Sequence, residues 1–164
     1  MGSEISTATY PVPEENIRVF GNMAASASTG GFWQWDTFFR PYIQAYDPVT
    51  RTTYVPCYQS GCRHNDPTCN ACFGDLQSLV EYRGNYCAMV FLNNETASAL
   101  VTRPLTGGPL QILANWEPET ENETCRCVLC YVSAGKAYVS VNREPNMLTE
   151  AGQQSTCLLY TSPS

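Results

Sequence analysis

The clearest hydrophobic pattern in the chain is an alternation with a period of two residues over residues 85–92. Tyr86, Ala88, Val90 and Leu92 fall on one side of an extended chain, and Cys87, Met89 and Phe91 fall on the other. Successive side chains of a strand point to opposite faces, so the segment is predicted to be a strand with two apolar faces. Such a strand must be covered on both sides, which places it at the centre of a domain.

The neighbouring segments show the same β pattern. "ASALVTRPL" and "PLQILANW" are predicted strands, and hairpins are predicted around Asp47-Pro48 and Ala134-Gly135. "DLQSLVEY" is predicted to begin with one helical turn that Asp75 caps. Six to eight short strands with almost no helix predict an all-β fold, an antiparallel β-sandwich.

Polarity divides the chain into three parts. Residues 1–30 are polar, small and Pro-containing, and are predicted to form a flexible N-terminal arm. Residues 31–156 form the predicted β-sandwich domain. Residues 157–164, "CLLYTSPS", resemble the translation of a sequencing adapter, so the native sequence is expected to stop being visible at Thr156 and the sandwich to be incomplete at its C-terminus.

Composition excludes several function classes. Only 15% of the 164 residues are charged and the net charge is −6, which argues against sequence-specific binding of nucleic acid. No apolar run reaches the ~18 residues of a membrane span. The motifs G-x-S-x-G and G-x-G-x-x-G and a Walker-type phosphate loop are absent from the sequence. Neither an enzyme nor a small-molecule substrate is therefore predicted.

The cysteines of this chain could form disulfides, bind a metal or remain free thiols. Without Cys157 there are eight: Cys57, Cys62, Cys69, Cys72, Cys87, Cys125, Cys127 and Cys130. An even, dense set fits disulfides in a secreted chain, in which the sequons at Asn94 and Asn122 would be glycosylated. The chain starts, however, without the basic and apolar regions of a signal peptide.

A structural zinc site is another use of these thiols, but disulfides or free buried thiols are favoured over it, so no metal or cofactor is predicted. The cluster Cys57-x4-Cys62-x-His64-x4-Cys69-x2-Cys72 supplies soft ligands within sixteen residues. Its four cysteines are the candidate ligands, although only Cys69-x2-Cys72 has the familiar knuckle spacing. His64, the only histidine, lies in the polar turn "RHNDP" and is expected to be solvated or hydrogen-bonded. Along a regular strand Cys125 and Cys127 point one way and Cys130 the other, so these three are not expected to share a metal.

Exposed aromatic side chains would offer a third kind of site. Trp33, Trp35, Tyr42 and Trp116 could form a platform for a sugar or for nucleic acid. Aromatic residues in a β-rich domain are more often core or interface anchors.

A family resemblance comes from the order of short motifs over about residues 36–105. "LVEYRGNYCAMVFLNNETASALVTRPL" resembles the segment of picorna-like virus capsid proteins in which an aromatic-Arg-Gly step leads into a jelly-roll strand. "FFRPYI", some forty residues upstream, resembles the Phe-Arg segment of dicistrovirus- and marnavirus-like capsid proteins. The cysteine-rich segment and "CRCVLCYVSAGK" depart from that family's pattern.

The resemblance implies a jelly-roll sandwich that self-assembles into a viral shell, with other capsid subunits as partners and the virion or host cytoplasm as its location. Phe39, Arg40, Arg83 and Gly84 are then the expected structural and assembly residues. Gly84 is expected to adopt a backbone geometry that a Cβ would disturb, and Arg83 to hold a neighbouring loop. The alternative from the cysteine pattern is a secreted, disulfide-bonded β-sandwich that binds ligands as lectins do.

Overall fold

A computed structural model describes residues 19–20, 22–26, 28–36, 39–145 and 154–161. The described residues form antiparallel β-sheets, and none of them is helical. The chain is thus all-β, as its sequence predicts. Residues 1–18 of the predicted arm lie outside the described residues, but Val19 already belongs to a strand, inside the segment assigned to the arm.

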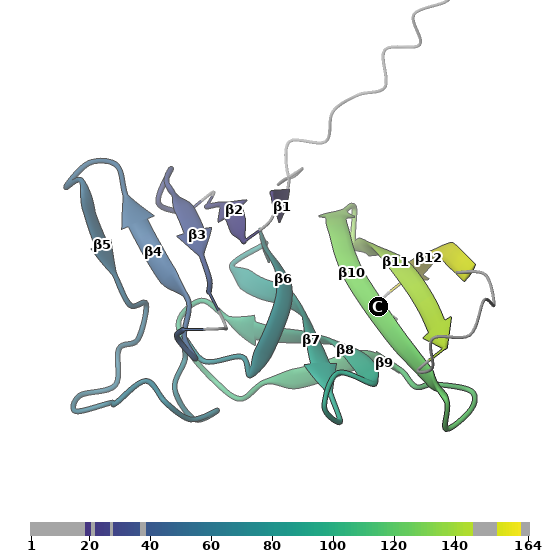
Figure 1. Cartoon of the computed structure of the whole chain (residues 1–164). Helices are drawn as coiled ribbons and strands as arrows, with labels where there is room; N and C mark the ends of the chain where they lie inside the picture. The colour runs from purple at the N-terminus through teal and green to yellow at the C-terminus, as the bar shows by residue number, and fades with distance from the viewer. Residues whose placement is uncertain (1–18, 21, 27, 37–38, 146–153, 162–164) are drawn as a thin grey trace, which may run out of the picture.

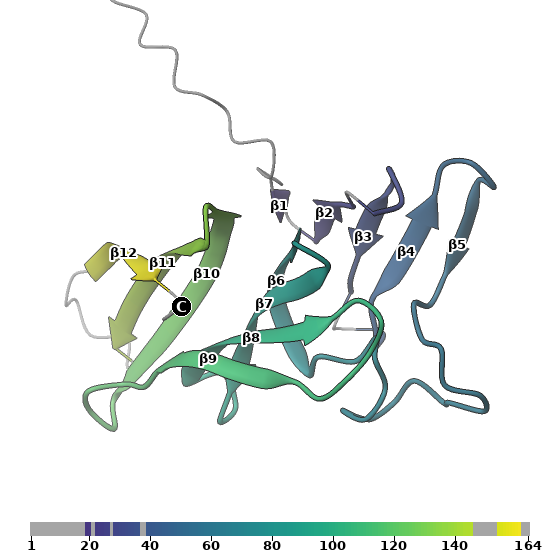
Figure 2. The same cartoon turned by 180° about the vertical axis from the view of Figure 1, so that it is seen from behind.

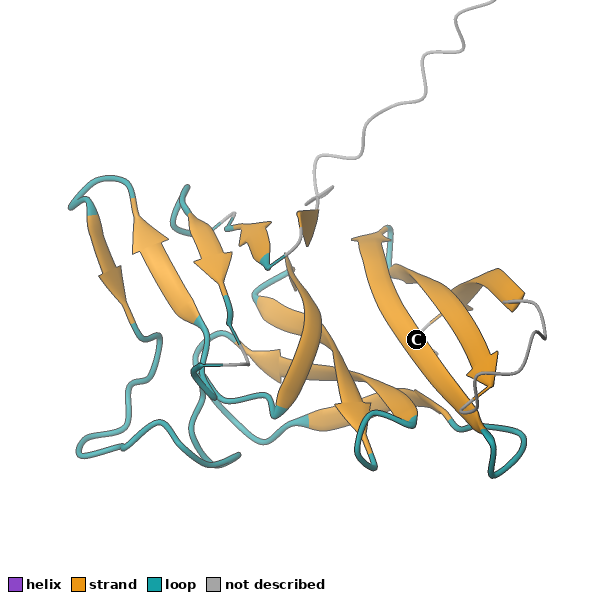
Figure 3. Ribbon diagram, viewed as in Figure 1, coloured by secondary structure: helices purple, strands orange, loops and turns teal. Residues whose placement is uncertain are grey.

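Three sheets follow one another along the chain (Figures 1 and 3). The first contains β1 (Val19–Phe20), β2 (Met23–Ala25), β3 (Phe32–Gln34), β4 (Gln44–Asp47) and β5 (Thr52–Tyr54). The central sheet contains β6 (Asp75–Tyr82), β7 (Asn85–Leu92), β8 (Ala97–Pro104) and β9 (Gln111–Trp116). The third contains β10 (Glu123–Ser133), β11 (Lys136–Pro145) and β12 (Gln154–Thr161).

Each hydrogen-bonded pair of described strands is consecutive in sequence. A jelly roll contains Greek-key connections, which place strands from distant parts of the sequence side by side. The jelly-roll arrangement is therefore not confirmed and remains a prediction. The backbone of β12, which includes part of the adapter-like sequence, pairs with β11.

The central sheet carries a cluster of buried apolar residues on each face. Figure 2 shows the first sheet and the third sheet on opposite sides of it. Tyr86, Ala88 and Val90 of β7 pack with the first sheet, whereas Cys87 and Met89 pack with the third. This confirms the two-sided pattern predicted for β7. Two core clusters result, one on each side of the central sheet.

A buried carboxylate ties the first sheet to the central one. Glu81 of β6 is 4% exposed and accepts hydrogen bonds from Trp33 Nε1 (2.9 Å) and Ser26 Oγ (2.9 Å). Ser28 donates to the same carboxylate through its backbone N–H (2.8 Å) and its hydroxyl (3.1 Å). A buried charge is costly unless it is paired or hydrogen-bonded, and these four donors satisfy it.

Buried serines connect the third sheet to the central one. Among the described strands β10 pairs only with β11, so the outer edge of β10 turns its polar backbone groups toward the central sheet. Ser98 Oγ donates to Cys125 O (2.8 Å) and accepts from Cys127 N–H (3.0 Å). Ser78 Oγ accepts from Leu129 N–H (2.9 Å). These hydroxyls satisfy backbone groups that the core would otherwise leave unpaired.

One local prediction is wrong. Asp75 does not cap a helical turn, because it is the first residue of strand β6. The register of β6 against β7 shifts between Leu76 and Ser78, so Leu76 and Leu79 pack in the same core cluster. This irregularity gives a strand the three-residue spacing that is typical of a helix. The hairpins at Asp47-Pro48 and Ala134-Gly135 are confirmed.

The Arg83-Gly84 step forms a two-residue hairpin between β6 and β7, in which Tyr82 pairs with Asn85. Both residues have positive φ, 47° at Arg83 and 75° at Gly84, as in a type I′ turn. Gly84 O accepts a hydrogen bond from Leu105 N–H (3.0 Å). Gly84 thus occupies the backbone region that favours glycine. The Arg83 guanidinium lies 5.1 Å from the centroid of the Tyr82 ring, and its predicted bond to a neighbouring loop stays a prediction.

Gly84→Val is expected to lower the free energy of unfolding by about 1–3 kcal/mol, because a β-branched residue is strained at positive φ. A Cβ at Gly84 would have no heavy atom within 4 Å, so backbone strain rather than collision causes the loss. Gly84→Asn is the matched control, since asparagine tolerates this conformation and suits the turn. Denaturant unfolding of both variants measures the difference. Equal losses for Val and Asn would contradict a type I′ constraint.

Candidate metal centre

The cysteine loop, defined as residues 57–73, connects β5 to β6 and lies against the first sheet and the central sheet. Ile43 N–H donates to Ala71 O (2.9 Å), and Tyr42 forms an isolated bridge with Cys72. Cys69, Cys72 and Phe73 belong to the core cluster between those two sheets. The loop is irregular, as its Gly, Asn, Asp and Pro residues predict, but its last five residues, 69–73, are buried.

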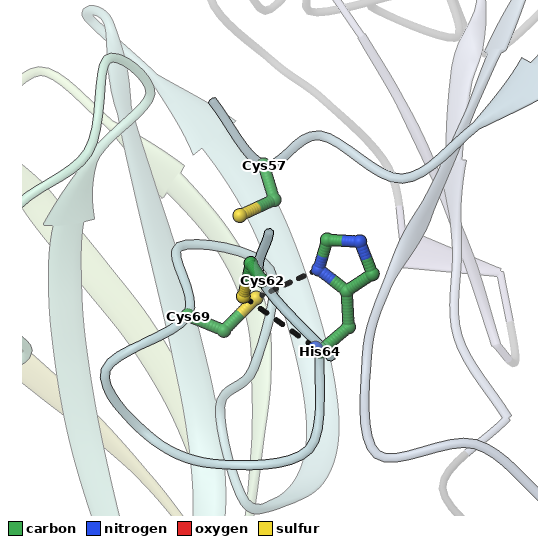
Figure 4. A group of neighbouring side chains, drawn as sticks. All are labelled: Cys57, Cys62, His64 and Cys69. Carbon is green, nitrogen blue, oxygen red and sulfur yellow. Dashed lines mark hydrogen bonds between the residues drawn. The ribbon is translucent and has the colours of Figure 1, made fainter. Parts of the chain in front are cut away.

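Four side chains of this loop converge: Cys57, Cys62, His64 and Cys69. Each offers one ligand atom, and the four atoms lie within 4.8 Å of one another. Figure 4 shows the three thiols and the imidazole turned toward a common centre. His64 Nδ1 lies 3.3 Å from Cys69 Sγ, and His64 N–H donates to Cys62 Sγ (3.4 Å). Cys69 is buried, and the other three are half-buried.

The backbone at His64 adopts a conformation that is uncommon for residues other than glycine. Its φ is 56°, in the left-handed region, where histidine occurs more often than most residues. The residue stands at the turn that returns the loop toward Cys69, and its ring contacts Tyr42 edge-on with 5.8 Å between centroids. Left-handed backbone conformations in residues other than glycine cluster at functional sites. The turn brings His64 Nδ1 to the thiols.

A buried arginine holds the second half of the loop. Arg103 of β8 is 1% exposed. Its Nη1 donates to Cys69 O (2.6 Å) and Cys72 O (2.9 Å), and its Nη2 donates to Pro67 O (2.8 Å). Its guanidinium carbon lies 5.3 Å from the centroid of the Phe73 ring. Arg103 therefore links the loop backbone to the central sheet at three carbonyls.

The thiols differ in their tendency to ionise. Burial raises the pKa of Cys69 and of Cys72. Burial also acts to raise the pKa of Cys57, but hydrogen bonds from the Gln59 backbone and from the neighbouring thiols outweigh it, so the pKa of Cys57 is lowered. A metal ion requires deprotonated thiols, so ion binding at this site would release protons.

The donor set fits zinc. Tetrahedral Cys3His is a familiar zinc coordination, in which bonds of ~2.1–2.3 Å place the ligand atoms about 3.3–3.8 Å apart. The four atoms of the cluster already lie within 4.8 Å. All four ligands come from the protein, as in structural zinc sites, whereas catalytic sites leave one position open. The cluster could therefore hold a metal ion.

The structure changes one member of the predicted ligand set. His64 takes the place assigned to Cys72, which is 2% exposed and packs in the core. His64 was expected to be solvated or hydrogen-bonded because it lies in the polar turn "RHNDP". Cys125 and Cys127 are buried and Cys130 is exposed, in agreement with the prediction that Cys130 points away from the other two. The eight cysteines within residues 39–145 are free thiols.

The other predicted site residues lie apart from this cluster. Phe39 is 77% exposed, Arg40 is exposed, and Arg40 donates to Gln44 Oε1. Asn94 and Asn122 lie on exposed turns. Trp33 and Trp35 are each 3% exposed, so both are core residues rather than a sugar platform.

Comparisons with protein-family models, with curated proteins and with solved structures give no match to this chain. Within the described ranges, the structure contains no helix with the length and apolar character needed to cross a membrane. The candidate site must therefore be interpreted from its own geometry.

The native thiols are expected to react with iodoacetamide at pH 8 in an order set by burial. Burial raises the pKa of Cys127 to about 12, and that of Cys125 is also raised by burial, so both remain protonated at this pH. Cys130 is exposed and should be alkylated before both of them. Peptide mass spectrometry after timed quenching measures the order, and alkylation in denaturant shows that every thiol can react. Modification of Cys127 as fast as Cys130 in the native protein would contradict the third-sheet packing.

Proposed function

We propose that this chain is a structural, non-catalytic β domain whose cysteine loop is fixed by one zinc ion. The convergence of Cys57, Cys62, His64 and Cys69 supports this proposal. The ion would supply no reaction. It would hold together two parts of a loop that has no regular secondary structure across residues 57–73.

The energetic reason lies in the loop's composition and position. Twenty residues (55–74) separate β5 from β6, and ordering each backbone residue costs about 1–2 kcal/mol. Much of the first half is exposed, including Gly61 and Arg63, so apolar burial offsets little of that cost there. Ligands from both halves of the loop, Cys57 and Cys62 before the turn and Cys69 after it, would close it on a metal.

One zinc ion per chain is expected to bind under reducing conditions. At free zinc about 1,000-fold above the dissociation constant, the free energy of unfolding should rise by about 4 kcal/mol. Native mass spectrometry gives the stoichiometry, and unfolding with zinc or with a chelator gives the stabilisation. A reduced, folded chain that retains no zinc would refute the site.

Four substitutions separate the ligand set of the structure from the set predicted by spacing. His64→Ala and Cys62→Ser should lose zinc, whereas Cys72→Ser should retain one ion. Cys130→Ser is the matched control, because Cys130 is exposed on β10 and remote in sequence from the loop. Zinc lost from Cys72→Ser and kept by His64→Ala would favour a four-cysteine site.

Assembly into a viral capsid is the second candidate function. The support is the motif resemblance together with apolar exposure. Of the six large apolar side chains exposed in the described part, five lie on the first sheet or in the segments that adjoin it: Met23, Phe39, Val49, Tyr54 and Tyr58. Every residue of β5, the free edge of that sheet, is exposed. An exposed edge strand with apolar neighbours favours association with another chain.

On this proposal the domain would pack against other capsid subunits in the manner of a jelly-roll protein, with Phe39 and Arg40 at the contact. Phe39→Ser is expected to reduce association of the purified chain, measured by light scattering and by electron microscopy of particles. Ile112→Ser is the control, because Ile112 is 65% exposed but lies on β9 of the central sheet. A parent chain that stays monomeric at high concentration, or equal losses for both variants, would contradict assembly through Phe39.

A further inference from the structure

We infer that Arg103 is the charge partner of the metal centre, so that its buried cation favours a centre with net negative charge. This inference rests on the proposed zinc site and goes beyond it, because it assigns a role to a residue that is not a ligand. The observation behind it is a buried guanidinium whose bonded partners are all neutral.

The contacts of Arg103 do not include a carboxylate in the described part of the chain. Its three hydrogen bonds go to backbone carbonyls, and the ion pairs there involve Arg126 and Arg143 instead. Arg103 Nε is buried and has no hydrogen-bond partner. Arginine keeps its charge in proteins, and a buried charge without a counter-charge costs stability.

The thiols of the cysteine loop are the groups that can supply the missing negative charge. Arg103 Nη1 donates to the carbonyls of Cys69 and Cys72, which places the guanidinium beside the backbone of one candidate ligand. Three thiolates, one neutral imidazole and Zn²⁺ give a centre with one net negative charge. Binding of the ion would thus convert neutral thiols into an anionic group beside the cation.

Two effects of Arg103 must be separated. Its hydrogen bonds position the loop carbonyls, and its charge stabilises the thiolates. A lysine keeps the charge but makes fewer bonds to the three carbonyls, whereas a glutamine keeps an N–H donor and removes the charge. Loss of a group that supports metal ligands typically costs about 10- to 100-fold in affinity.

The test compares zinc dissociation constants of the parent chain, Arg103→Lys and Arg103→Gln, measured by competition with a chromophoric chelator. We expect Arg103→Gln to weaken zinc binding by about 10- to 100-fold and Arg103→Lys to weaken it clearly less. Arg126→Gln is the matched control, because Arg126 pairs with Glu95 on the surface and should leave the affinity unchanged. Visible spectra of the Co²⁺ forms check that all variants keep the same tetrahedral ligands.

A second comparison removes the charge of the centre itself. Cys62→His converts the ligand set to two thiolates and two imidazoles, which with Zn²⁺ is neutral. In this background Arg103→Gln should cost much less zinc affinity than in the parent. Equal losses in the two backgrounds, or a lysine variant no better than the glutamine variant, would overturn the charge role. If Cys62→His binds no zinc, the zinc affinities of Arg103→Lys and Arg103→Gln in the parent chain alone test the charge role.

Zinc binding by the parent chain separates failure of the metal site from failure of the charge role of Arg103. If it binds no zinc, the proposed function fails and the role of Arg103 fails with it. If it binds one zinc ion and both Arg103 variants lose affinity equally, the metal site stands and only the charge role is refuted.

Discussion

The burial of both faces of the central sheet is the constraint on which the rest of the structure depends. β7 places Tyr86 and Ala88 in one core cluster and Cys87 and Met89 in the other, so neither face can be left in water. Two covering layers are required, and each is attached by a polar group buried at its contact. Glu81 binds the first sheet, while Ser78 and Ser98 bind the edge of β10. Apolar burial supplies the driving force, and these groups fix where each layer sits.

The cysteine loop belongs to the same arrangement. Phe73 contacts Tyr86 edge-on, with 5.4 Å between ring centroids, and Arg103 of β8 holds the carbonyls of Cys69 and Cys72. The loop therefore completes the cover of the central sheet that the first sheet begins. Ordering the loop costs conformational entropy and so lowers the stability of the fold. A closed Cys3His site would offset that cost, and the metal would catalyse no reaction.

The sequence predicted what depends on local pattern and missed what depends on convergence. The alternation of β7 and the hairpins at Asp47-Pro48 and Ala134-Gly135 are local signals, and the structure contains all three. The prediction of a helical turn at Asp75 was wrong because the irregularity of β6 puts Leu76 and Leu79 on one face. That three-residue spacing also occurs on one face of a helix. The place of His64 in the cluster depends on a left-handed turn, which spacing does not reveal. The burial of Arg103 depends on where the loop packs, and "VTRPL" gives no sign of it.

Both proposed functions involve strand β5 of the first sheet and the loop that follows it. β5 ends at Tyr54, and Pro56, which is buried, leads directly to the first metal-ligand candidate, Cys57. A zinc ion that fixes Cys57 would also restrict the free edge of β5, where apolar exposure favours contact with another chain. An ordered edge loses less conformational entropy on association than a mobile one. If both proposals hold, zinc would promote assembly through preorganisation, although none of its ligands need touch the partner chain.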